Sequence, residues 1–127
     1  MKRIIVIEDN AMAASLYQAA LSRDGYGVEV ASDGEAGLAA IARLRPDLVL
    51  LDLMLPKVDG SEVLRRIRAT PDLATLPVII TSNAYTPSRL EELRRAGATQ
   101  IMIKASLSPK ELTRVVRETL GQLEPAS

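Results

Sequence analysis

Five short runs of apolar residues recur along the chain, separated by longer segments of mixed polarity. Runs of this length that are rich in valine, isoleucine and leucine are typical of strands buried on both faces of a parallel sheet. The five runs are residues 4–7, 28–31, 48–51, 78–80 and 101–103. The pattern therefore predicts five strands.

The segments between these runs carry apolar residues three to four positions apart, which is the spacing of one helix face. In the first segment this face comprises Ala13, Leu16, Tyr17, Ala20 and Leu21. In later segments it comprises Ala36, Leu38, Ile41 and Ala42, then Val63, Leu64 and Ile67, and finally Leu112, Val115, Val116 and Leu120. The sequence therefore predicts helices between and after the strands, with Tyr17 in the core.

Several residues mark where helices begin and end. Thr86 before Pro87 is a good cap followed by a good first helical residue. Ser108 and Pro109, with Glu111 behind them, form the pattern of a capping box. Glycines that can end a helix stand at Gly25, Gly97 and Gly121.

Strands that alternate with helices imply an α/β fold with a parallel sheet, helices on both faces and right-handed crossovers. We therefore expect a doubly wound (βα)5 domain over residues 1–121 and a C-terminal tail at residues 122–127. In such sheets a ligand binds beyond the carboxyl ends of the strands, where the strand order reverses. Functional residues are thus expected at the strand ends.

The amino-acid composition limits which ligands the chain is expected to bind and which reactions it can perform. The 127 residues suit one domain, and 16 basic and 16 acidic residues cancel, so neither nucleic-acid nor membrane binding is expected. The chain has no histidine and no cysteine, so it cannot donate a phosphoryl group from histidine, and any metal must be held by oxygen, as Mg²⁺, Ca²⁺ and Mn²⁺ are. Glu8 and Asp9 follow Met1 too closely for a signal peptide, which predicts a cytoplasmic location.

Polar residues follow four of the predicted strands. Glu8 and Asp9 follow the first, Asp52 the third, Ser82 the fourth and Lys104 the fifth. Carboxylates that meet at one sheet edge repel one another, and a divalent cation such as Mg²⁺ relieves that repulsion. Each acid alone would be a solvated loop residue, but acid, hydroxyl and amine at four strand ends together favour a site.

This set of groups fits attack by a carboxylate on phosphorus. Asp52 can form an acyl phosphate. A metal ion, Lys104 and Ser82 can hold the oxygens of the transferring group. The sequence contains neither a Walker A motif nor the dinucleotide-binding glycine fingerprint, so a nucleotide is not the expected ligand.

On these motifs the chain resembles the bacterial response-regulator receiver domain over nearly its whole length. The motifs are residues 5–10 (IVIEDN), 46–56 (PDLVLLDLMLP), 59–60 (DG), 77–82 (PVIITS) and 97–98 (GA), which leads to Lys104. The resemblance implies a flavodoxin-like receiver fold with strand order 2-1-3-4-5. It also implies that Asp52 is the phosphoacceptor and that Glu8, Asp9, Asp52 and the backbone carbonyl of Met54 hold Mg²⁺.

The resemblance further implies a switch. Ser82 is its hydroxyl, Lys104 contacts the phosphoryl group, and Asn83 replaces the usual small residue beside them. Ile101 stands where the family usually has tyrosine or phenylalanine, so Tyr85 is a candidate for the missing aromatic readout, with a plain loop residue as the alternative. Ala105, likewise, replaces the usual proline after the lysine.

Partners follow from the same resemblance. A sensor histidine kinase or a histidine phosphotransfer protein is expected to phosphorylate the domain, and a downstream protein to bind the face of the fourth helix, fifth strand and fifth helix. Thr99 and Gln100 stand where many DNA-binding members carry two acids that build a symmetric dimer, so a monomer or weak dimer is expected. The domain is expected to signal rather than to act as an enzyme.

A stand-alone receiver that resembles the chemotaxis regulators and works through protein–protein contact is expected. Three alternatives stay open: a receiver excised from a longer regulator with an effector domain, a phosphorylation-independent adaptor, and a Mg²⁺-dependent phosphohydrolase. Phosphohydrolases of the haloacid dehalogenase type need an acid two residues after the nucleophile, where this chain has Met54. Arg65, Arg66 and Arg68 form either a nucleic-acid patch or a solvated helix face, and the zero net charge favours the helix face.

Overall fold

Five parallel strands form one sheet in the order β2-β1-β3-β4-β5. The structure, a computed structural model, describes residues 1–83 and 86–121. The strands are β1 (Arg3–Ile7), β2 (Gly27–Ala31), β3 (Leu48–Asp52), β4 (Val78–Ser82) and β5 (Gln100–Ile103). The helices are α1 (Ala11–Arg23), α2 (Gly34–Leu44), α3 (Gly60–Ala69), α4 (Pro87–Arg95) and α5 (Pro109–Thr119), with 3₁₀ turns at Pro71–Leu73 and Lys104–Ser106. The predicted (βα)5 fold and strand order are confirmed.

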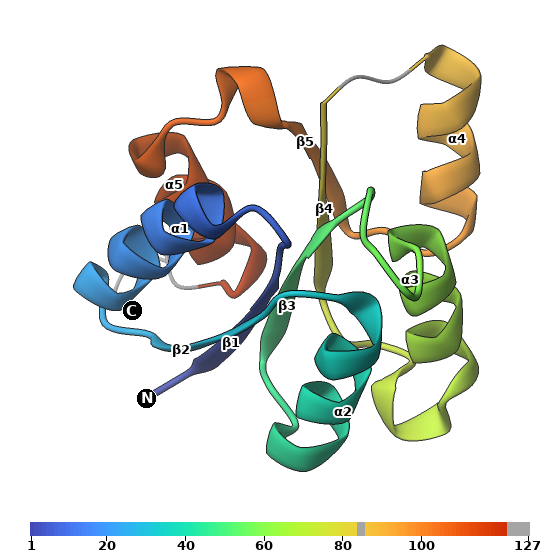
Figure 1. The fold of residues 1–127 in the computed structure, drawn as a ribbon, viewed down its shortest axis with the longest axis horizontal. Coiled ribbons are helices and arrows are strands. Elements are labelled where there is room, and N and C mark those ends of the chain that lie inside the picture. Colours follow the sequence, from blue (N-terminus) through green and yellow to red (C-terminus); the bar gives the residue numbers. More distant parts are fainter. Residues whose placement is uncertain (84–85, 122–127) are drawn as a thin grey trace.

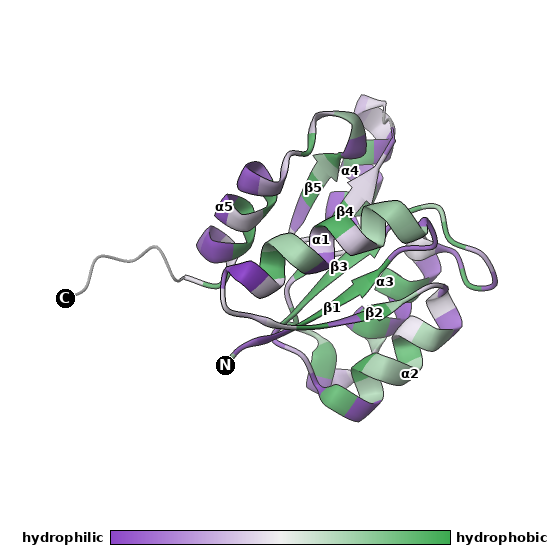
Figure 2. Cartoon of the chain, turned by 60° about the vertical axis from the view of Figure 1, so that its left-hand side comes forward, coloured by the Kyte–Doolittle hydropathy of each residue, from purple (hydrophilic) through white to green (hydrophobic). Residues whose placement is uncertain are grey.

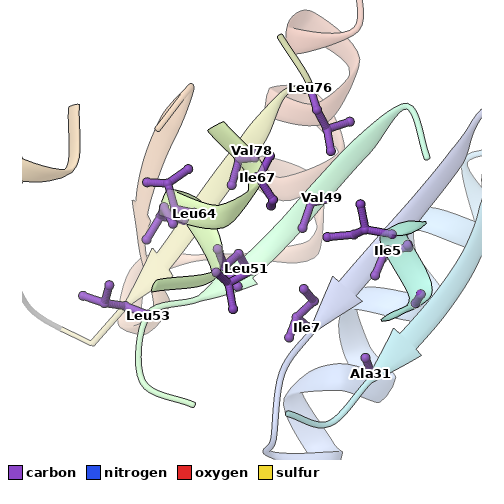
Figure 3. Packing of buried hydrophobic residues seen from close by; sticks show 14 of the residues in the cluster. Ile5, Ile7, Ala31, Val49, Leu51, Leu53, Leu64, Ile67, Leu76 and Val78 are labelled. Carbon is purple, nitrogen blue, oxygen red and sulfur yellow. The ribbon is translucent and has the colours of Figure 1, made fainter. Parts of the chain in front are cut away.

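Helices cover both faces of the sheet: α1 and α5 lie on one face, and α2, α3 and α4 on the other (Figure 1). Each face has its own apolar core. The α2–α4 core includes Ile5, Ile7, Ile41, Val49, Leu51, Val63, Leu64, Ile67, Ile80 and Leu93 (Figure 3). The α1–α5 core includes Ile4, Val6, Tyr17, Leu21, Tyr26, Leu48, Leu50, Ile79, Leu112, Val115 and Val116. The expected place of Tyr17 in the core is confirmed.

The apolar residues of β1, β3 and β4 are buried, as expected for strands covered on both faces. Figure 2 shows β1 and β3 mainly in green, the colour of hydrophobic residues. The expectation is wrong for the edge strands β2 and β5, which are mostly half-buried because each has a neighbouring strand on one side only. Two helix faces also differ from prediction. Leu16 is 56% exposed, and on α2 the buried positions include Gly37, which packs against Ile7, rather than Ala36 and Ala42.

Helix ends follow the predicted signals. The Thr86 hydroxyl accepts a hydrogen bond from the Arg89 amide at 3.2 Å, and the Ser108 hydroxyl accepts one from the Glu111 amide at 3.1 Å. Gly97 has a φ of 105°, a left-handed conformation that glycine adopts without strain. The local sequence therefore sets where α4 and α5 begin and where α4 ends.

The Asp59-Gly60 motif forms the start of α3. The Asp59 carboxylate accepts a hydrogen bond from the Ser61 hydroxyl at 2.5 Å and caps the helix. A Cβ atom on Gly60 would lie 2.4 Å from the Asp52 carbonyl oxygen and 2.7 Å from the Leu53 Cα. Glycine at this position thus lets α3 begin directly against the end of β3.

The prediction of a solvated arginine face on α3 is wrong for Arg68. Its guanidinium donates to the Gly97 carbonyl from Nε at 3.0 Å and from Nη2 at 2.8 Å, and to the Leu73 carbonyl from Nη1 at 3.3 Å. Arg65 and Arg66 are exposed as expected. Arg68 is therefore a structural tie between α3 and the turn before β5.

Within the described ranges, no helix has both the length and the apolar character needed to cross a bilayer. The tail expected at residues 122–127 and the readout residue Tyr85 both lie outside the described residues.

Candidate functional site

The strand register brings three of the predicted charged residues to one side of the sheet. Side chains alternate along a strand, so Glu8 lies on the same side as Val6, and Asp52 on the same side as Leu50. Both Val6 and Leu50 belong to the α1–α5 core. Lys104, at the end of β5, reaches across β4 to both acids. The carboxyl edge of the sheet under α1 thus carries the site.

Short contacts join these groups. Lys104 Nζ lies 2.7 Å from Glu8 Oε1 and 3.4 Å from Asp52 Oδ2. The Met54 amide donates to Asp52 Oδ1 at 3.3 Å, and the Asn10 amide donates to Glu8 Oε2 at 3.1 Å. Glu8 is 2% exposed and Asp52 4%. The site therefore holds two buried carboxylates and one ammonium group.

Burial dominates the ionisation of Asp52. Removal from water and the negative charge of Glu8 raise the pKa of Asp52 to about 6, although Lys104 and the Met54 amide act in the opposite direction. Burial disfavours the charged form of Lys104, but the contact with Glu8 and the charges of both acids leave its pKa above the ordinary value. The pKa of the Asp52 carboxyl thus lies about one unit below neutral pH in the absence of a metal ion.

The acids fit a divalent cation. Glu8, Asp9 and Asp52 each offer a carboxylate oxygen, and these three atoms lie within 4.8 Å of one another. Glu8 Oε1 is fully buried and forms an ion pair with Lys104 Nζ. Oxygen ligands in this number suit Mg²⁺, which keeps several water ligands.

The predicted switch residues lie at the end of β4 and in β5. Thr81 is the register partner of Asp52, so Ser82 lies one position further toward the carboxyl edge. Ser82 is buried, and Asn83 after it is exposed. Ile101 is half-buried and packs against the α2–α4 core, on the opposite face of the sheet from Lys104.

Two further hydroxyl residues, Thr81 and Tyr17, were given no role in the site from the sequence. Thr81 is buried beside Asp52 in the sheet. Tyr17 was assigned only to the core. Burial raises the pKa of its hydroxyl, the charge of Lys104 lowers that pKa, and the charges of Glu8 and Asp52 raise it. Strand alternation would have placed Thr81 on the side of Asp52, but no pattern along α1 indicates where the Tyr17 hydroxyl lies.

A doubly wound five-stranded sheet with an acidic cluster and a lysine at its carboxyl edge defines an α/β domain of the receiver type. The chain belongs to the response regulator receiver domain family, which matches residues 4–117. It is a receiver domain of two-component response regulators.

Relatives and solved structures agree with this assignment. The response regulator MprA of Mycobacterium leprae is 34% identical over 97% of this chain and 53% of its own. The chemotaxis protein CheY4 of Vibrio cholerae, 24% identical, shares the fold with a TM-score of 0.88 over 94% of this chain and 98% of its own. The BeF3-activated receiver domain of Klebsiella pneumoniae RstA is 29% identical, with a TM-score of 0.85 over 93% and 97%. The chain spans about half the length, or less, of the curated relatives it matches.

Proposed function

We propose that Asp52 accepts a phosphoryl group in a Mg²⁺-dependent reaction and that another protein reads the phosphorylated state. The observation that carries this proposal is the buried Asp52 carboxylate at the end of β3, with the Lys104 ammonium 3.4 Å away and the oxygens of Glu8 and Asp9 beside it. These are a nucleophile, a cation for the phosphoryl oxygens and ligands for a metal ion.

The chemistry follows from these groups. A carboxylate oxygen of Asp52 attacks phosphorus, the bond from phosphorus to the histidine nitrogen of a donor breaks, and the nitrogen keeps the electron pair. Mg²⁺, when bound by Glu8, Asp9, Asp52 and the Met54 carbonyl, supplies positive charge to the transferring oxygens. Lys104, whose ammonium lies 3.4 Å from Asp52 Oδ2, supplies a second positive charge to these oxygens.

Ser82 and Asn83 are the proposed phosphate-binding groups of the switch. Phosphorylation of Asp52 adds charge and acceptor oxygens at the carboxyl edge, where Ser82 lies one position beyond the register partner of Asp52. Lys104 then pairs with the phosphoryl group. Because Lys104 directly follows β5, we propose that the resulting conformational change extends to β5. Ile101 cannot make the polar contact of an aromatic switch, so the proposed output depends on the segment after Ser82, which includes Tyr85.

The proposed partners are a sensor histidine kinase or a histidine phosphotransfer protein and a downstream protein that binds α4, β5 and α5. Mixed charge on α4 and α5, including the ion pairs of Arg95 with Glu91 and of Arg114 with Glu118, gives that face a polar character suited to a protein partner. We place this signalling in the cytoplasm. Because the curated relatives are longer, an effector domain in the complete protein remains an alternative output.

Incubation with Mg²⁺ and acetyl phosphate, followed by measurement of the intact mass, tests the proposal. The wild-type chain should gain one phosphoryl group, and Asp52→Asn should gain none. Asp59→Asn is the matched control, because Asp59 is an exposed helix cap near the site and asparagine caps a helix equally well. Labelling of the Asp52→Asn protein would contradict the assignment of Asp52 as the acceptor. A wild type that gains no phosphoryl group would instead favour an adaptor that works without phosphorylation.

A further inference from the structure

The Lys104 ammonium contacts two of the three carboxylates that we propose as metal ligands. Its Nζ lies 2.7 Å from Glu8 Oε1 and 3.4 Å from Asp52 Oδ2, so Glu8 is its nearer partner. One oxygen of each of these acids, together with one of Asp9, belongs to the cluster whose atoms lie within 4.8 Å of one another. The ammonium and the proposed metal ion therefore share ligands.

The two oxygens of Glu8 have different partners. Oε2 accepts a hydrogen bond from the Asn10 amide at 3.1 Å, and the Asn10 side chain caps α1 by accepting one from the Ala13 amide at 2.9 Å. Oε1 is buried and pairs with Lys104. The start of α1 fixes the amide in place, whereas the ammonium stands at the end of a flexible four-carbon side chain. A cation that binds Glu8 would thus exchange with the ammonium and not with the amide.

Burial makes this exchange one of charge for charge. The side chains of Glu8 and Asp52 are buried and that of Lys104 is 17% exposed, whereas Asp9 is exposed. A buried carboxylate without a counter-charge is strongly destabilising, so Glu8 needs one cation beside it. Two cations at the same buried oxygen would repel each other with little screening by water or salt. Glu8 therefore accommodates either the ammonium or a metal ion, but not both at full strength.

We propose that Lys104 and Mg²⁺ compete for Glu8, so that the ammonium leaves Glu8 and moves toward Asp52 when the metal ion binds. The inference rests on the proposed function, because it takes Glu8 as a ligand of the metal ion. Competition of this kind weakens metal binding, and by linkage metal binding weakens the pair of Lys104 with Glu8 by the same factor. The ammonium thus becomes free to pair with the phosphoryl group on Asp52 once the metal ion is in place.

The Mg²⁺ affinity of the unphosphorylated protein, measured by NMR titration of the backbone amides, tests the competition. Lys104→Met removes the ammonium and keeps a side chain of similar length, so the dissociation constant should fall about tenfold. Lys57→Met is the matched control, because it removes the same charge from the loop after β3, where the Lys57 ammonium pairs with Asp33 at 3.6 Å. This variant should stay within about twofold of the wild type, because both members of a pair at the surface are screened by solvent.

The titrations are repeated at about 0.1 M and about 0.5 M KCl, because salt screens exposed charges but not a buried pair. The gain in affinity of Lys104→Met should persist at both concentrations. An affinity that is unchanged or weaker would overturn the proposal. An equal gain in Lys57→Met, or a gain that disappears at high salt, would also overturn it, since net charge alone would then explain the effect. A wild type that binds no Mg²⁺ would instead refute the metal site of the proposed function.

The wild-type protein provides a second test that needs no variant to fold. The ¹⁵N signal of the Lys104 ammonium should move as Mg²⁺ is added, with the same dissociation constant as the backbone amides, because the ammonium changes its carboxylate partner. The ammonium signal of Lys57 should stay in place. A Lys104 signal that does not move while the amides around Glu8 respond would show that the ammonium keeps its contacts, and the competition would be refuted.

Discussion

Asp52 ionises at a cost to the metal-free fold, and Asp52→Asn should therefore stabilise that fold near neutral pH. Burial and the charge of Glu8 raise the pKa of Asp52 from 3.8 to about 6. A carboxyl group with a folded-state pKa above its unfolded value binds more protons in the folded state between the two values. Stability is accordingly lost as the pH rises through the window between them, and the full cost remains at higher pH.

The size of this effect follows from the shift in pKa. Each unit is worth about 1.4 kcal/mol, so a shift of about two units gives at most about 3 kcal/mol. Local relaxation around the site reduces this value, and we expect Asp52→Asn to raise the free energy of unfolding by about 1–3 kcal/mol at pH 8. Asparagine has the shape of aspartate and can still accept the hydrogen bond from the Met54 amide.

Urea unfolding in EDTA, measured from pH 4 to pH 8, tests this prediction. The curves of wild type and Asp52→Asn should converge near pH 4 and diverge as the pH rises. Asp59→Asn, an exposed acid at a helix cap, should follow the wild type throughout. A variant that is no more stable than the wild type at pH 8, or a difference that is the same at every pH, would refute the electrostatic argument.

Three further changes test the surroundings of the site. Lys104→Met should lower the free energy of unfolding by about 1–3 kcal/mol at pH 8 and by less at pH 5, because protonation relieves the unpaired acids; urea unfolding at both pH values measures this. Gly60→Ala should cost about 1–3 kcal/mol or more in the same assay, since its Cβ would lie 2.4 Å from the Asp52 carbonyl oxygen. Ile101→Tyr should leave phosphorylation of Asp52 intact by intact mass, because Ile101 faces the α2–α4 core, and loss of labelling would show that position 101 supports the site.

The sequence predicted the sheet well because its central strands are buried on both faces. Such strands are continuous apolar runs, and polar residues appear where each run reaches the open edge, so the positions of Glu8, Asp52 and Lys104 followed from their neighbours along the chain. Helix faces were predicted less well. Leu16 has the spacing of a core residue but lies outside, because the orientation of α1 on the sheet depends on contacts with α5 and β2 as well as on its own pattern.

The role of Arg68 could not be predicted for a different reason. Its guanidinium donates to the carbonyl of Gly97, which is 29 residues away in the chain, and nothing in the run of arginines on α3 distinguishes Arg68 from its exposed neighbours. This role arises from the way separate elements pack.

The charges of the site explain why a metal ion and phosphorylation belong together in the proposed function. Glu8, Asp9 and Asp52 carry three negative charges when ionised, and Lys104 returns one positive charge, which leaves two negative charges at the carboxyl edge. Lys104 alone leaves the pKa of Asp52 raised, so without a metal ion the nucleophile is partly protonated near pH 6. A divalent cation would balance the remaining charge and favour the ionised Asp52 that attacks phosphorus. In the proposed function, the same imbalance that destabilises the metal-free fold would be relieved by the metal ion that the transfer needs.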